Sequence, residues 1–100
     1  MPYIPAEKRK RYDPLINNLV EALLAEDEQA MLGDLNYFIY ATMLRYLSKR
    51  TFRYHRIAAL LGTLECCKQE FYRRVAGPYE DKAIERSGDI AVDEKGKGND

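Results

Sequence analysis

The densest group of side chains that could bind a ligand is the Tyr72–Arg74 cluster, which combines a phenol with two guanidinium groups. Guanidinium groups bind phosphates and carboxylates through pairs of parallel hydrogen bonds, so the cluster suits an anionic ligand. Tyr79 and Glu80 follow a Gly-Pro pair and could fold back onto it. The alternative is a structural network in which an arginine of the cluster pairs with Glu80 or Asp81. The candidate binding residues here are Tyr72, Arg73, Arg74 and Tyr79.

A second candidate site is the basic turn 45–56, which lies in a stretch that carries five basic residues and no acidic one, residues 35–58. Basic side chains of this kind contact the phosphates of nucleic acids. Residues 57–62 match the first half of a helix-turn-helix motif, but Lys68 falls where an apolar residue should dock the recognition helix. Phosphate binding therefore stays open, whereas sequence-specific DNA recognition is disfavoured. The candidate residues are Arg50, Arg53 and Arg56.

Catalytic and metal-binding patterns are poorly represented in the chain. His55 is the single histidine, and no nucleophile elbow, P-loop or dinucleotide-binding motif is present. The two cysteines, Cys66 and Cys67, are adjacent, so neighbouring helical positions would point them about 100° apart. They are either two small apolar residues on a packed helix or a redox or soft-metal pair. We expect no catalytic residue, no metal site and no cofactor.

The charges are balanced overall but arranged in blocks. Sixteen basic residues face sixteen acidic ones, which disfavours a general polyanion binder and favours self-association. Residues 13–34 nevertheless carry a net charge of −6, and residues 35–58 carry +5. This pattern predicts an acidic first helix beside a basic hairpin, with the charges paired within one molecule, between two copies, or with an anionic partner.

A length of 100 residues suits one small domain, and the composition is that of a globular protein. The longest apolar run, residues 57–61, is far shorter than the roughly 20 residues that cross a membrane. The first residues also lack the apolar segment of a signal peptide. We expect a cytoplasmic protein that does not bind membranes, in which reduced cysteines are normal.

Helical periodicity accounts for most of the chain, and no long segment alternates with a period of two. The first residues, 1–6, read as an extended arm, and residues 6–12 could form a short helix. A longer helix is expected to begin at Pro14, with Asp13 as its N-cap, and to end near residues 26–29. A second helix, apolar almost all round, should begin at Gly33-Asp34 and end at the break 48–51.

A third helix is expected from residue 52 or 54 to about residue 76, with a stripe of small residues at Ala58, Gly62 and Cys66. Such a stripe lets another helix approach closely. Gly77-Pro78 predicts a stop or a sharp kink, followed by one or two turns over 79–86. The predicted fold is therefore all-α, with three principal helices, an extended N-terminal arm and a short C-terminal helical tail. The domain covers residues 1–90, and residues 91–100 form a disordered polar tail.

Four segments of the chain together resemble a family of short uncharacterised proteins from phages and bacteria, with the pattern MPYI…GELNY…LECAKLEFYRRV-x-x-PYED-x-KI-x-x-NGD. The segments are Met1-Pro2-Tyr3-Ile4, Gly33-Asp34-Leu35-Asn36-Tyr37, residues 64–75 and residues 78–82. The chain departs from the pattern at Asp34, at Cys67 and in Ser87-Gly88-Asp89, and it carries an extra polar tail. The resemblance implies a small accessory protein encoded by a phage or prophage, and it assigns no catalytic residue.

Tyrosine is over-represented, with eight tyrosines, three phenylalanines and no tryptophan. Tyrosines suit interfaces that are partly apolar and partly hydrated, and Tyr37 on the second helix is the candidate interface residue. We expect a non-enzymatic accessory or interaction protein that forms a homodimer and binds a host or phage protein. The alternative is a nucleic-acid or nucleotide binder that uses the basic turn 45–56 and the Tyr72–Arg74 cluster.

Overall fold

The computed structural model describes residues 2–90, and these contain helices and no strand. The predicted all-α class, with three principal helices, an N-terminal arm and a C-terminal helical tail, is confirmed. Residues 91–100, for which disorder is expected, lie outside the described residues. Backbone contacts divide the chain into two compact units, Met1–Cys66 and Cys67–Asp100. Each unit is described on its own below.

Helix α1 spans Ala6–Leu24 and follows the arm without interruption. Pro5 has polyproline-like angles (φ −55°, ψ 145°), and its carbonyl accepts the N–H groups of Lys8 and Arg9 at 2.9 and 3.1 Å. The Arg9 side chain also donates to the carbonyl of Ile4 at 2.8 Å, which ties the arm to the helix. The expected start at Pro14 is wrong, because Pro14 lies inside α1 and Asp13 is not a cap. Residues 6–12 are good helix formers and lead directly into the apolar stripe 15–24, so one helix covers both segments.

Helix α2 spans Glu28–Ser48, and it begins earlier than the glycine suggests. Asp27 is the N-cap, and its carboxylate accepts the N–H of Ala30 at 2.9 Å. Gly33 and Asp34 therefore lie inside the helix, which corrects the expectation that they open it. An aspartate with extended angles just before a run of helix formers supplies the first turn with an acceptor, so the helix needs no later start. The end of α2 at Ser48 agrees with the predicted break.

The third helical stretch has three parts that follow one another without a gap. Helix α3 spans Tyr54–Phe71, a π-helical turn, η1, spans Tyr72–Ala76, and α4 spans Gly77–Ser87. The expected stop at Gly77-Pro78 is absent, because Pro78 occupies the first turn of α4. In a regular α-helix the proline ring would clash with the carbonyl four residues earlier, and the wider π turn just before it relieves this clash. Helix α4 ends at Ser87, as predicted, and Gly88 follows with a φ of +81°.

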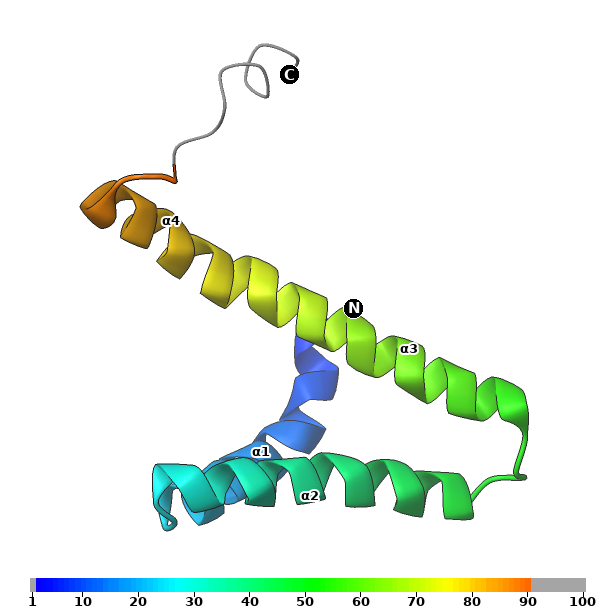
Figure 1. The fold of residues 1–100 in the computed structure, drawn as a ribbon. Coiled ribbons are helices and arrows are strands. Elements are labelled where there is room, and N and C mark those ends of the chain that lie inside the picture. The colour runs from blue at the N-terminus through cyan, green and yellow to red at the C-terminus, as the bar shows by residue number, and fades with distance from the viewer. Residues whose placement is uncertain (1, 91–100) are drawn as a thin grey trace, which may run out of the picture. The chain divides into compact units, whose positions relative to one another are not determined.

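Within the unit Met1–Cys66, α1 and α2 pack side by side as a helical hairpin (Figure 1). Its partly covered side chains include Leu19 and Leu23 of α1 and Met31, Leu35 and Ile39 of α2. Even these are only partly covered, since no residue in the described part of the chain is buried. Many large apolar side chains are exposed, among them Leu15 at 63% and Tyr37 at 64%. The hairpin therefore lacks a closed hydrophobic core.

The described helices include none that is long and apolar enough to cross a membrane.

The position of the α2 cap can be tested by substituting two aspartates. Asp27→Ala removes the side-chain acceptor for the N–H of Ala30 and should lower the free energy of unfolding by about 1 kcal/mol. Asp13→Ala, by contrast, replaces a weak helix former inside α1, so stability should stay the same or rise slightly. Chemical denaturation followed by circular dichroism measures both. A loss of similar size for Asp13→Ala would show that a helix begins there.

Candidate functional site

The first apolar cavity of the Met1–Cys66 unit lies where the N-terminal arm meets α1 and α2. It has a volume of about 500 Å³ and is lined by Ile4, Tyr12, Leu15, Ile16, Leu19, Phe38 and Thr42. These side chains come from the arm, from the apolar stripe of α1 and from the middle of α2. Leu15, Ile16 and Phe38 are exposed. The arrangement can accept an apolar side chain or a helix face, and it offers no charged group.

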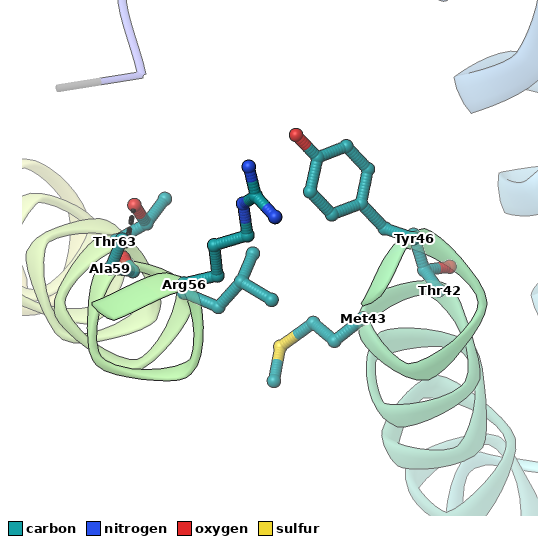
Figure 2. Close-up of a pocket in the computed structure, with 7 residues that line it drawn as sticks. Thr42, Met43, Tyr46, Arg56, Ala59 and Thr63 are labelled. Atoms are coloured by element: carbon teal, nitrogen blue, oxygen red, sulfur yellow. Dashed lines mark hydrogen bonds between the residues drawn. The ribbon is translucent and has the colours of Figure 1, made fainter. Parts of the chain in front are cut away.

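A second cavity, of about 370 Å³, lies between α2 and the first turns of α3, and Figure 2 shows it. Met43 and Tyr46 point into it from α2, and Arg56 extends from α3 toward the Tyr46 ring (Figure 2). The full lining is Thr42, Met43, Tyr46, Arg56, Ala59, Leu60 and Thr63. Because Thr42 lines both cavities, they form two parts of one apolar surface along α2, which we call the α2 groove.

The outward face of α2 carries a third hollow, of about 380 Å³, lined by Gly33, Asn36, Tyr37 and Tyr40. Tyr37 was a candidate site residue on sequence grounds, and here it is 64% exposed. Its hydroxyl accepts a long hydrogen bond of 3.5 Å from Arg45. A methyl group at Gly33 would meet no atom within 4 Å, so nothing in the described chain requires a glycine at this position.

The arginines of the basic turn do not all point to solvent. The guanidinium of Arg50 lies over the Tyr46 ring, 5.3 Å from its centre. Arg56 donates to the carbonyl of Thr51 and lines the α2 groove. Arg53 is exposed, and its carbonyl accepts the N–H groups of the first turn of α3. The structure therefore spreads Arg50, Arg53 and Arg56 over different environments.

The Tyr72–Arg74 cluster is held by contacts within the Cys67–Asp100 unit. The hydroxyl of Tyr72 donates to a carboxylate oxygen of Glu80 at 2.9 Å. Arg73 forms a bidentate ion pair with Glu70, at 2.7 and 2.9 Å. Tyr79 does not join these residues, and instead its ring lies under the guanidinium of Arg86 at 5.9 Å. This network connects η1 to α4 across the position of Pro78.

The network differs from both forms expected from the sequence. Glu80 folds back onto the cluster, but its partner is the phenol of Tyr72 and not an arginine. Arg73 pairs with Glu70, one helical turn before it, because a three-residue spacing brings two helical side chains together. A guanidinium that already holds a carboxylate through two bonds is less available to an external anion. Arg74 is the member of the cluster whose side chain carries no such bond within the described residues.

The charge blocks remain unpaired with each other in the described part of the chain. Ion pairs join Lys10 to Glu7 and Arg73 to Glu70, and neither pair includes a residue of 13–58. No acidic residue of 13–34 is therefore ion-paired with a basic residue of 35–58 among the described residues. Of the alternatives left open by the sequence, pairing within one molecule is not what this structure shows.

The chemistry of the remaining reactive groups is simple. Cys66 and Cys67 are both exposed free thiols, so they are not packed in the single chain. The part of the chain that the structure describes holds no cluster of three or more histidine, cysteine or acidic side chains placed to bind a metal ion. His55 is exposed at the start of α3.

The sequence did not indicate several residues of these surfaces. Ile4 and Phe38 line the first cavity together with the α1 stripe, although Ile4 lies in the arm. Arg56 was expected to bind phosphate, but it lines the α2 groove together with Met43 and Tyr46. The signal that could have indicated this cavity is the apolar stripe 15–24. It is too wide for a single neighbouring helix to cover, so part of it must form an open apolar surface.

The features described so far are those of an all-helical chain with open apolar surfaces. The chain belongs to a family described as a domain of unknown function (DUF6899), whose model matches residues 1–90. This confirms the expectation of an uncharacterised family. No functionally curated protein and no solved structure matches the chain.

The hydrogen bond between Tyr72 and Glu80 can be tested by titration. The bond, followed by the negative charge of Glu80 and slight desolvation, raises the pKa of Tyr72 above its ordinary value of 10.0. The resulting stabilisation is fully present below pH 10 and is lost as the pH rises through the raised pKa. Tyrosinate absorbance measures the ionisation, and subtracting the titration of Tyr72→Phe from that of the wild type isolates the signal of Tyr72. This difference should appear above pH 10.

Glu80→Gln is the matched control, because it keeps an acceptor but removes the negative charge. Tyr72 should then ionise at lower pH than in the wild type. If the difference titration falls at or below pH 10, the hydrogen bond does not form in solution.

Proposed function

We propose that the chain is a non-enzymatic interaction protein that acts as a homo-oligomer and forms its hydrophobic core between copies. One observation carries the proposal: no residue in the described range 2–90 is buried, although 46% of the full sequence is apolar. The exposed residues include large aliphatic and aromatic side chains on each of the three long helices. Monomeric proteins of this size bury a core of such residues.

The energy balance supports association. Ordering the backbone costs about 1–2 kcal/mol per residue, and burial of apolar surface is the main compensation. Partly covered side chains remove less apolar surface from water than a closed core does. Their burial therefore offsets less of the entropy cost of ordering the chain. A second chain on the α2 groove or on the outward face of α2 would remove that surface from water. Stability should therefore depend on association.

The partner class is a protein surface that is apolar and partly hydrated. Both cavities of the α2 groove are lined mostly by apolar side chains, and tyrosines stand at their edges. Besides the chain itself, a host or phage protein is the proposed partner. The resemblance to short phage and bacterial proteins favours a phage-type accessory role, and a cytoplasmic location is part of the same proposal.

The second candidate is a nucleic-acid or nucleotide binder, and the unpaired basic block favours it. No residue of 35–58 forms an ion pair within the described chain, so Arg53 and its neighbours are available to phosphates. Two observations weaken this candidate: Arg56 lies in the α2 groove, and Arg73 already holds Glu70. A site that depends on these arginines must first break their contacts within the chain.

Native mass spectrometry of protein purified gently in low salt from its host tests both candidates. We expect a dimer or a higher oligomer, without nucleotide or oligonucleotide mass. An added mass of that kind, lost at higher salt and in an Arg50→Ala/Arg53→Ala variant, would favour the second candidate. A monomer at all concentrations, with no bound protein, would contradict the proposed function.

A further inference from the structure

We propose that two copies pair in antiparallel orientation through the outward face of α2, with Leu44 of one copy seated over Gly33 of the other. The inference rests on the proposed function, since it names the partner surface of the homo-oligomer. The occupant of this face is a second copy of the same chain. Three properties of the face lead to this pairing: its spacing, its hollow and its charges.

The outward face is a narrow seam made of Gly33, Tyr37, Tyr40 and Leu44. Their spacings of four, three and four residues place them in one line along a helix, as in an antiparallel coiled coil. The opposite face carries Leu35 and Ile39, which are partly covered. The seam is uncovered instead: Tyr37 is 64% exposed, Tyr40 61% and Leu44 48%.

The hollow over Gly33 gives the seam a place for a protruding side chain. Gly33, Tyr37 and Tyr40 line it, and, apart from its two chain neighbours and the nearby backbone of α2, no atom lies within 4 Å of the position that a methyl group at Gly33 would take. A glycine inside a helix is less favourable than alanine, and at Gly33 the open hollow gives this cost a use, because it lets a neighbouring helix approach closely. Leu44 stands three turns further along the same seam and is the apolar knob that fits such a hollow.

The seam is self-complementary only when the two helices run in opposite directions. A two-fold axis midway between Tyr37 and Tyr40 places Tyr37 against the partner's Tyr40 and Tyr40 against the partner's Tyr37. The same axis sets Gly33 against the partner's Leu44 and Leu44 against the partner's Gly33. One symmetric contact thus fills both hollows at once, as isologous dimers require.

The charges beside the seam select the same orientation. Asp34 and Arg45 lie on the same edge of the seam, near its two ends. In antiparallel helix pairs like edges face each other, so Asp34 lies within reach of the partner's Arg45 on both sides of the axis. Neither side chain forms an ion pair within the described residues, and Arg45 makes only a long bond to Tyr37, 3.5 Å.

A charge-exchange experiment tests the orientation. Asp34→Lys and Arg45→Glu each set like charges against each other at both ends of the seam. Each variant should raise the dimer dissociation constant about tenfold, measured by sedimentation equilibrium at low salt. The double variant restores opposite charges and should return within about threefold of the wild type. Glu21→Arg, an exposed acid on α1, is the control for altered net charge and should have little effect.

Substitution of the two mid-helix glycines tests the hollow. Gly33→Ala should raise helix stability, because the methyl group meets nothing in the chain, but weaken association, because it closes the hollow. Gly62→Ala in α3 also meets nothing within 4 Å and should raise helix stability without weakening association. If Gly62→Ala weakens the dimer and Gly33→Ala does not, the small-residue stripe of α3 is the interface and our pairing is wrong.

The results separate this inference from the proposed function. A wild-type oligomer that is unchanged by Asp34→Lys, Arg45→Glu and Gly33→Ala overturns the α2 pairing and leaves the homo-oligomer intact. A wild type that stays monomeric overturns both. Circular dichroism of each variant is recorded at a high protein concentration, where association is complete, and verifies that the substitution itself does not disrupt the helices.

Discussion

The apolar surface of the helices exceeds what one copy covers, and the other features of this protein depend on that imbalance. Helices α1 and α2 pack together, yet Leu19, Leu23, Leu35 and Ile39 between them are only partly covered. The hydrophobic effect scales with the apolar area removed from water. Burial of the apolar surface that remains exposed would therefore favour association with another protein surface. Large exposed apolar patches of this kind mark interaction sites. The exposed apolar surface therefore supports the proposal that the chain acts as a subunit of a homo-oligomer.

Helix α2 is the element that contributes to each of the three hollows and hence to both proposed interaction surfaces. One side of it packs on α1 and forms the α2 groove through Phe38, Thr42 and Met43, while the other side presents the seam around Tyr37. The charge blocks follow from the same geometry, since the helix is acidic near its start and basic beyond its end. Charges of this arrangement add little to affinity but determine orientation, so they suit a symmetric pair.

The sequence predicted the helices well and their contacts poorly. Apolar spacing located the three long helices and Ser48 ended the second, because periodicity and breakers act locally. The start of the second helix was misplaced at Gly33-Asp34 because several aspartates precede helix formers. Only the structure shows that the side chain of Asp27 accepts the N–H of Ala30. Tyr37 was identified as an interface candidate, but the inward position of Arg56 and the pairing of Tyr72 with Glu80 depend on distances between turns that spacing alone does not specify.

The most direct test of a core formed between copies is the midpoint of thermal unfolding as a function of protein concentration. If the folded helices require association, mass action raises the midpoint steadily as the chain is concentrated. We expect this rise in the wild type, together with loss of helix on dilution. A midpoint that does not change with concentration, in a chain that remains fully helical when dilute, would show that one copy is sufficient for folding and would contradict the central claim.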